Sequence, residues 1–144
     1  MSYFFSAQGF AQHTGLGLIR IIVGAFMVYH GLEVFLHDKM VGYAQWLSDL
    51  HFPAPSTMAY LGKGSELVGG IFLLLGLFTR LAVIPLIITM GVIAFGMGHG
   101  KIWMDDQHPF LFMLLCLVFF FYGPGRFSLD KLLFKKNDPR LVIH

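Results

Sequence analysis

The sequence predicts an all-α integral membrane protein, built as a single bundle of four transmembrane helices. Hydrophobic residues make up 56% of its 144 residues, charged residues make up 12%, and the mean hydropathy is +0.71. Soluble domains carry about 25% charged residues, and a water-soluble chain of this length could not hide so much apolar surface. Four apolar segments also have roughly the length that a bilayer requires. We expect residues 1–144 to form one transmembrane domain.

The predicted spans cover residues 15–36, 60–78, 81–98 and 107–122. A helix needs about 20 apolar residues to cross a bilayer. The fourth segment is the shortest of the four and falls below this length. Only Thr79 and Arg80 separate the second span from the third, which requires an antiparallel helical hairpin. The apolar runs do not alternate as barrel strands do, so we expect helices to be the spanning elements.

The distribution of lysine and arginine predicts that both termini are cytoplasmic. An even number of spans places both termini and the two-residue turn on the same side of the membrane. That side carries seven of the ten basic residues: Arg20, Arg80, Arg126, Lys131, Lys135, Lys136 and Arg140. The opposite side carries Lys39, Lys63 and Lys101, which four aspartates offset. We therefore expect an N-in, C-in topology.

The first outer loop is predicted to contain a short helix that lies in the membrane interface. Residues 41–50 are the expected helix, and Tyr43 and Trp46 suit the aromatic belt at the headgroup level. The letters FPAP follow, and proline is expected to end the helix because it lacks an N–H and restricts the residue before it.

The segment after the fourth span is predicted to be a topological anchor with an amphipathic tail. Gly123, Pro124 and Gly125 are expected to stop the span where it reaches the cytoplasm. Ser128 is expected to cap a short helix whose apolar side chains rest on the membrane while its lysines face lipid phosphates.

Titratable side chains inside the spans are the candidates for function, because a charge at membrane depth is costly. From the rise per residue, His30 lies about 6 Å outward of the middle of its span, and Glu66 lies about 4 to 5 Å outward of the middle of its own. Adjacent helices would therefore place them at one level. The outer half of the bundle gathers His30, Glu33, Glu66, His99 and His108, whereas the inner half has only Arg20.

Each of these residues also has a structural explanation. Arg20 can snorkel to headgroups or make a structural contact, and Glu33 lies near enough to the interface to be hydrated. His30 alone is most simply a satisfied interior histidine, and His99 and His108 border a loop that can be solvated. Glu66 is the hardest to explain in this way, and its cost falls if His30 or Lys63 is its partner.

Several other chemistries are disfavoured by the sequence. A net charge of +2 is too small to indicate nucleic-acid binding, and the single cysteine, Cys116, forms no CxxC pair. His30 paired with His99 or His108 is a conceivable axial set for haem, but no attachment motif or tight ligand spacing accompanies them. His30 and Glu33 form one HxxE pair, whereas carboxylate-bridged metal sites use this motif twice. We expect neither haem nor a metal site.

Three stretches, in their order and spacing, resemble the DoxX family of small bacterial membrane proteins. They read GLGLIRIIVGAFMVYHGLEVF, SELVGGIFLLLGLFTRLA and GPGRFSLD. By motif, the positions carried over are Arg20, His30, Gly31, Glu66, Gly69, Gly70, Arg80, Gly123, Gly125, Arg126 and Asp130. The family pattern often has a lysine near the end of the first span, where this chain has Glu33.

This resemblance implies a four-helix bundle in the bacterial inner membrane and a link to redox metabolism. A related branch, DoxD, is a membrane subunit of a thiosulfate:quinone oxidoreductase, and other members are associated with oxidative-stress complexes or quinone resistance. The resemblance to this family therefore favours a quinone as the small molecule that the protein binds. A protein partner or a second copy of the chain is expected alongside the lipid bilayer.

The leading hypothesis is a quinone-associated subunit of a membrane oxidoreductase. His30 and Glu66 are the expected catalytic pair, because a quinone carbonyl needs a hydrogen-bond donor and its reduction needs protons. Arg20, Glu33, His99 and His108 are the expected binding residues or polar network. Electrons must come from a partner, since the chain shows no flavin, iron–sulfur or dinucleotide motif. The alternatives are a non-catalytic scaffold for a soluble partner and a carrier of a small molecule or proton.

Overall fold

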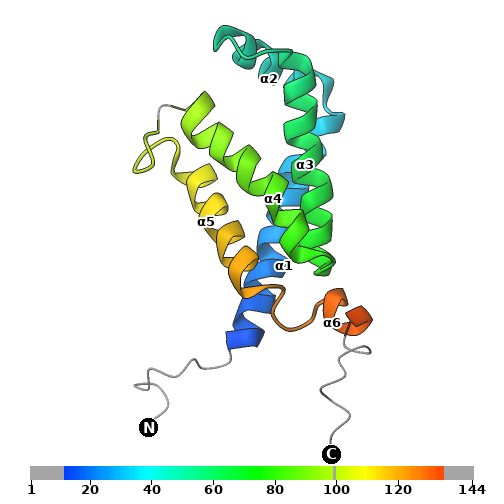
Figure 1. Ribbon diagram of the computed structural model, residues 1–144. Helices are drawn as coiled ribbons and strands as arrows, with labels where there is room; N and C mark the ends of the chain where they lie inside the picture. Colours follow the sequence, from blue (N-terminus) through cyan, green and yellow to red (C-terminus); the bar gives the residue numbers. More distant parts are fainter. Residues whose placement is uncertain (1–11, 99, 135–144) are drawn as a thin grey trace, which may run out of the picture.

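The computed structural model describes residues 12–98 and 100–134, and every regular element in that part of the chain is helical (Figure 1). In chain order, the elements are α1 (Gln12–Gly31), the 3-10 helix η1 (Leu32–Phe35), α2 (His37–Asp49), α3 (Pro55–Leu75), α4 (Thr79–Gly91), the π-helix η2 (Val92–Met97), α5 (Gln107–Tyr122) and α6 (Leu129–Phe134). Three helical stretches are long and apolar enough to cross a membrane: Gln12–Phe35, Pro55–Leu75 and Thr79–Met97. The 16-residue α5 is a shorter apolar helix.

All four predicted spans are helices, and α5 has the predicted bounds of 107–122. The second span differs, because α3 begins five residues earlier than predicted and ends at Leu75 rather than at residue 78. Pro55 starts it, since the first position of a helix needs no N–H donor and suits the fixed φ of proline. Gly76 ends it with a φ of 67°, a left-handed conformation that glycine adopts without strain.

The long helices share one apolar core, and their two ends differ. Buried side chains from all four meet in this core: Val23, Met27, Leu73, Val83, Leu86, Met90, Phe112, Cys116 and Phe119. The most extensive contacts join α1 to α3 and α4 to α5, whereas α1 and α5 touch little. The start of α1 and α6 lie at one end of the bundle, and α2 lies at the other (Figure 1). We refer to these as the α6 end and the α2 end.

The short helix predicted at 41–50 exists, but it begins earlier, at His37. Leu36 separates it from η1 with an extended conformation (φ −95°, ψ 98°), so the chain turns there. Met40 and Leu47 are buried and pack with Ala59 of α3 and Met97 of η2. The helix ends at Asp49, before the prolines, so proline does not terminate it. Its position in a membrane interface stays a prediction.

Glycines allow the backbones of α1 and α3 to approach closely. A Cβ atom built on Gly24 lies 2.5 Å from the backbone nitrogen of Leu74, and one built on Gly70 lies 2.7 Å from that of Val28. Gly31 makes a similarly tight approach to Leu67. Such contacts replace the large side chains that would otherwise separate two helices. Gly24 and Gly31, seven residues apart along α1, therefore determine where α3 can pack, whereas Gly17 faces the segment that follows α5.

We expect Gly24→Ala to destabilise the bundle by about 1–3 kcal/mol, because the added methyl group forces the α1 and α3 backbones apart. Thermal unfolding in detergent, followed by circular dichroism, measures this change. Gly15→Ala is the matched control in the same helix, because a Cβ there meets nothing within 4 Å. An equal effect of both substitutions would show that helix propensity, rather than this contact, decides the result.

Candidate functional site

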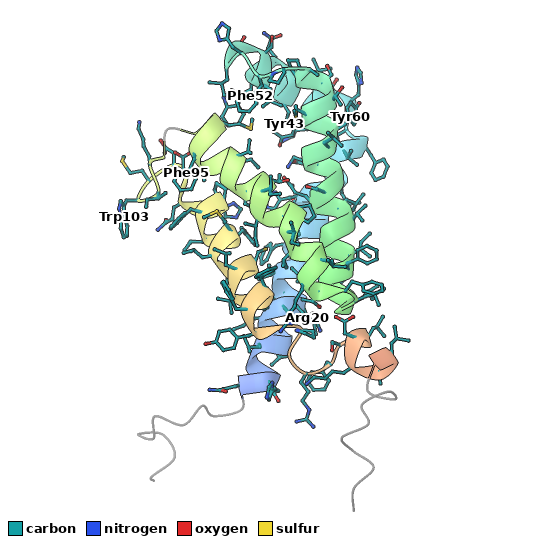
Figure 2. The ribbon with its side chains drawn as sticks, viewed as in Figure 1. Arg20, Tyr43, Phe52, Tyr60, Phe95 and Trp103 are labelled. Atoms are coloured by element: carbon teal, nitrogen blue, oxygen red, sulfur yellow. The ribbon has the colours of Figure 1, made fainter. Side chains whose placement is uncertain are left out.

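Polar side chains gather at the two ends of the bundle. At the α2 end, Glu33, Lys39, Tyr43, Lys63 and Glu66 form a connected group, which we name the Lys63 network. At the α6 end, Arg20 is surrounded by the segment that follows α5, an arrangement that we name the Arg20 lock. Figure 2 shows Tyr43 and Arg20 at these opposite ends.

Lys63 holds the centre of its network between two carboxylates. Its Nζ lies 2.9 Å from Oε2 of Glu66 and 3.1 Å from Oε2 of Glu33. Lys39 lies at the outer edge, with its Nζ 3.6 Å from Oε1 of Glu33. Glu66 is buried, and the pairing with Lys63 offsets the cost of keeping its charge away from water.

Local structure explains why these groups meet. Lys63 and Glu66 are three residues apart on α3 and therefore share one face. Glu33 lies on η1, which begins directly after Gly31. Because Gly31 has no side chain, α1 can pack closely against α3 at this point. Tyr43 comes from α2, and its Oη donates a hydrogen bond of 2.6 Å to Oε2 of Glu33. Its ring also lies under Lys63, with the ammonium 4.9 Å from the ring centroid.

Tyr43 is held in its protonated form by these surroundings. Burial raises the pKa of the Tyr43 phenol above its ordinary value, and the hydrogen bond to the Glu33 carboxylate raises it further, while the nearby Lys63 charge acts in the opposite direction. The phenol is therefore a hydrogen-bond donor at neutral pH, and it keeps Glu33 directed at Lys63.

His30 contacts a second histidine rather than Glu66. The ring centroids of His30 and His108 are 5.4 Å apart, and those of His108 and Phe112 are 4.7 Å apart. The Tyr29 ring also contacts His30, with the ring centroids 5.6 Å apart. The charges of Lys63 and Glu33 also act on His30, so the histidine pair borders the Lys63 network. Of the two partners considered for Glu66, Lys63 is the one in hydrogen-bond contact.

The remaining predicted site residues have different positions. His99 lies outside the described residues. Among the residues that are described, no three His, Cys, Asp or Glu side chains are arranged to hold a metal ion. Arg20 lies apart from the other candidates, at the α6 end.

Arg20 is fully buried, so the snorkelling interpretation is wrong and the structural contact is present. Its guanidinium donates to backbone carbonyls of two separate segments. Nη1 donates to the Leu73 and Leu74 carbonyls near the end of α3. Nε donates to Pro124 over 2.8 Å, and Nη2 donates to Phe127 over 2.7 Å. A planar group with five donors suits this task, which a lysine ammonium could not perform in the same geometry.

Asp130 connects the same segment to the turn between α3 and α4. Its carboxylate accepts hydrogen bonds from the backbone nitrogens of Phe78 (2.7 Å) and Thr79 (3.1 Å), at the start of α4. Its own backbone nitrogen donates to the Gly76 carbonyl over 2.9 Å. A carboxylate at a helix N-terminus accepts hydrogen bonds from N–H groups that have no partner within the helix, and it interacts favourably with the positive end of the helix dipole. Ser128 caps α6 as predicted, accepting from the Lys131 nitrogen over 3.3 Å.

The glycines of the GPGR stretch allow close contact with α1. Gly125 has a φ of 70°, and a Cβ there would lie 2.7 Å from the backbone nitrogen of Gly17. Gly123 ends α5 with a φ of 82°. The Arg126 nitrogen donates to the His13 carbonyl over 2.6 Å, while the Arg126 side chain is exposed. The GPGR stretch therefore packs around Arg20 and forms part of the Arg20 lock. The sequence predicts only a topological anchor for this stretch.

The three remaining motif residues, Gly69, Gly70 and Arg80, also make packing contacts. A Cβ on Gly69 would lie 2.9 Å from the Leu86 side chain of α4, and Gly70 lies against α1 as described above. Arg80 is exposed, and its Nη2 lies 3.5 Å from the Phe121 carbonyl of α5. These residues hold α3 and α4 against their neighbours.

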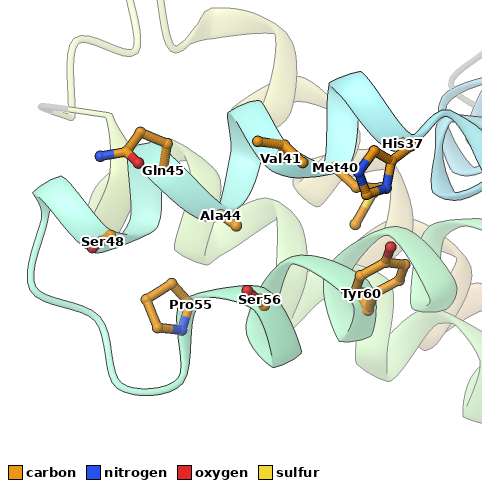
Figure 3. A pocket seen from close by; sticks show the side chains of 9 residues that line it. All are labelled: His37, Met40, Val41, Ala44, Gln45, Ser48, Pro55, Ser56 and Tyr60. Carbon is orange, nitrogen blue, oxygen red and sulfur yellow. The ribbon is translucent and has the colours of Figure 1, made fainter.

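A separate groove of about 370 Å³ lies between α2 and the first turns of α3 (Figure 3). The side chains that line it are His37, Met40, Val41, Ala44, Gln45, Ser48, Pro55, Ser56 and Tyr60. None of the residues of the Lys63 network lines it.

Sequence reasoning missed two members of the Lys63 network. Lys63 is one of the two partners that the sequence offers for Glu66. Tyr43 was interpreted as an aromatic-belt residue, and Lys39 as a loop charge. No local pattern links Tyr43 or Lys39 to Glu33. The turn at Leu36 decides which face of α2 packs against the long helices, and this turn is not evident from the sequence.

Known proteins resemble the chain over most of its length. The sequence profile of the DoxX family matches residues 15–99. An uncharacterized membrane protein of Mycobacterium tuberculosis is 33% identical over 138 residues, covering 82% of this chain and 80% of the relative. CatD of Bacillus subtilis, provisionally named an oxidoreductase, is 31% identical over 128 residues, covering 84% and 88%. The inner membrane protein YphA of Escherichia coli is 29% identical over 139 residues, covering 85% and 93%. No solved structure matches the chain significantly.

We expect Arg20→Lys to lower the free energy of unfolding by about 2–4 kcal/mol, because a single ammonium cannot satisfy the carbonyls that the guanidinium reaches. Thermal unfolding in detergent measures the loss. Arg126→Lys makes the same chemical change at an exposed side chain of the same lock, and we expect it to be neutral. Similar stability of both variants would contradict the structural role of Arg20.

Tyr43→Phe is expected to change how stability depends on alkaline pH. The raised pKa means that the phenol contributes stability that is fully present below its unfolded value, about pH 10. This stability is lost as the pH rises through the folded-state pKa, because the unfolded chain releases the proton first. Melting temperatures measured at increasing pH above 10 should therefore fall less steeply in Tyr43→Phe than in the unmodified protein. Parallel curves would contradict the prediction.

Proposed function

The chain belongs to the DoxX family, and on this basis we propose that it is a quinone-associated subunit of a membrane oxidoreductase. The similarity to CatD, provisionally named an oxidoreductase, supports a redox role. The similarity to the inner membrane protein YphA supports the bacterial inner membrane as its location. We further propose that both termini are cytoplasmic, which places the α2 end on the outer side.

The observation that carries this proposal is the buried carboxylate of Glu66 within a transmembrane helix, paired with Lys63. Ionisable groups at membrane depth are costly and are kept where they bind or move charge. Reduction of a quinone consumes protons at its oxygens as electrons arrive. A carboxylate, an ammonium and a neighbouring histidine can supply hydrogen bonds to a quinone carbonyl and protons to the reduced ring.

The aromatic side chains beside the Lys63 network suit a flat ring. His30 and His108 lie edge to face across α1 and α5, and Phe112 and Phe26 continue this contact, with ring centroids 6.2 Å apart. Aromatic faces and edges bind planar ligands well, and a ring nitrogen can reach a carbonyl oxygen. We propose that the quinone head lies against His30 and His108, next to Lys63.

A partner protein completes this activity. The sequence has no flavin, iron–sulfur or dinucleotide motif, so the electrons that reduce the quinone come from another subunit. The role of this chain is then to bind the quinone in the membrane and to exchange its protons.

Quinone content provides the direct test. The full chain is purified from native membranes in mild detergent and extracted with organic solvent, and the extract is analysed by ultraviolet spectroscopy and mass spectrometry. We expect bound quinone in the unmodified protein, and a reduction of about ten-fold or more in Glu66→Gln and His30→Ala, equivalent to about 1.4 kcal/mol of binding.

Two substitutions of the same type control for folding. Asp105→Asn and His13→Ala alter exposed side chains outside the proposed site, and we expect both to retain quinone. Absence of quinone from the unmodified protein, both as purified and after incubation with a short-chain quinone, would overturn the proposal. Full retention by Glu66→Gln and His30→Ala would also do so, and would favour a scaffold for a soluble partner.

A further inference from the structure

Burial increases steadily along the Lys63 network. The side-chain exposed fraction is 57% for Lys39, 20% for Glu33, 12% for Lys63 and 2% for Glu66. Consecutive members are in contact at 3.6, 3.1 and 2.9 Å. A simple structural ion pair would need only Lys63 and Glu66. The chain of titratable groups instead extends from the surface at the α2 end to the most deeply buried carboxylate.

We propose that the Lys63 network is a one-sided proton path that connects Glu66 to the aqueous phase at the α2 end alone. This inference deepens the proposed function, since it assigns the side from which protons of the quinone reaction are exchanged. It concerns the protonation of Glu66, which is measurable without a quinone.

The transfer follows from the contacts. The Glu33 carboxylate takes a proton from the solution at the surface, either directly from hydronium or by way of Lys39, which the solution then reprotonates. The Lys63 ammonium donates a proton to Oε2 of Glu66, and the resulting amine takes the proton held by Glu33, which becomes a carboxylate again. One proton thereby moves from the solution to Glu66, and every other group returns to its starting state. The reverse sequence releases a proton to the same side.

Charged and polar groups from four elements besides α3 form or face this path. Glu33 comes from η1 and Tyr43 from α2, while His30 of α1 lies within the influence of the Lys63 and Glu33 charges. Tyr43 positions Glu33 through its hydrogen bond, and its ring faces the Lys63 ammonium. On α4, the Thr89 hydroxyl bonds Ser65, the residue next to Glu66, over 2.7 Å.

The opposite direction is closed. Among the described residues, the buried polar or charged side chains other than Glu66 are Arg20, Thr79 and Ser128, and all three lie at the α6 end. Glu66 and Leu73, whose carbonyl binds Arg20, are separated by about 10 Å along α3. Apolar side chains fill the core between them, including Met27, Val83 and Leu86. The permanent charge of Arg20 adds an electrostatic barrier to a proton.

Infrared spectroscopy of sealed proteoliposomes tests the sidedness. The full chain is reconstituted without quinone, the carboxyl band of Glu66 is identified by its loss in Glu66→Gln, and the pH is changed separately inside and outside. The side that exposes α2 is located with a membrane-impermeant maleimide on Ser48→Cys, whose side chain is exposed. We expect the Glu66 band to follow the pH of that side only. A response to the other side, or no change between about pH 4 and pH 10, overturns the proposal.

The path itself is tested by time-resolved infrared spectroscopy after light-triggered proton release. We expect Glu33→Gln, which keeps the size of the side chain but cannot carry a proton, to slow protonation of Glu66 by about ten-fold or more. Glu33→Asp retains a titratable group and should recover part of the rate. Asp38→Asn is the matched control at an exposed carboxylate of α2 and should leave the rate unchanged.

An unchanged rate in Glu33→Gln overturns the path. A slow Glu33→Gln variant in a protein that binds no quinone keeps the path and removes only the proposed function.

Discussion

A guanidinium buried inside an apolar bundle is the constraint on which the rest of the structure depends. Arg20 has no accessible surface, so its donors must be satisfied by the protein. Backbone carbonyls meet this need, and they come from the end of α3 and from the segment that follows α5. The two segments must be held against α1 for the charge to be tolerated. Gly17 and Gly125 make that approach possible, and Asp130 ties the same segment to the start of α4.

The polar group at the α2 end depends on the same packing. Gly31 brings α1 against Leu67 of α3, and the turn that follows places Glu33 next to Lys63. Without that approach Lys63 would neutralise Glu66 but would have no second carboxylate. Polar groups therefore enter the bundle from both ends, and an apolar core lies between Glu66 and Arg20. Among the described residues, apolar side chains separate Glu66 from Arg20, and the connected titratable groups that reach Glu66 come from the α2 end.

Much of the fold is readable from composition and periodicity. Long apolar runs must be helical in a bilayer, since no water is present to satisfy the backbone, and a two-residue connection requires an antiparallel pair. The bounds of α5 and the cap of α6 follow from local chemistry in the same way. The start of α3 was predicted wrongly, because proline both breaks a preceding helix and begins a new one, and local sequence does not choose between them.

The class of protein, the helices and the identity of the costly residues Arg20, His30, Glu33 and Glu66 can be predicted from the sequence, because an ionisable side chain within a long apolar segment lies at membrane depth however the helices pack. The pairing of Lys63 with Glu66 is local to α3, but the other partners depend on the tertiary structure. Glu33 reaches Lys63 where α1 packs on α3, Tyr43 returns to Glu33 through the turn at Leu36, and Arg20 meets carbonyls from residues 53 to 107 positions away in the chain. Such contacts depend on how closely helices pack and on where the chain turns, and these are properties of the assembled bundle rather than of any one segment.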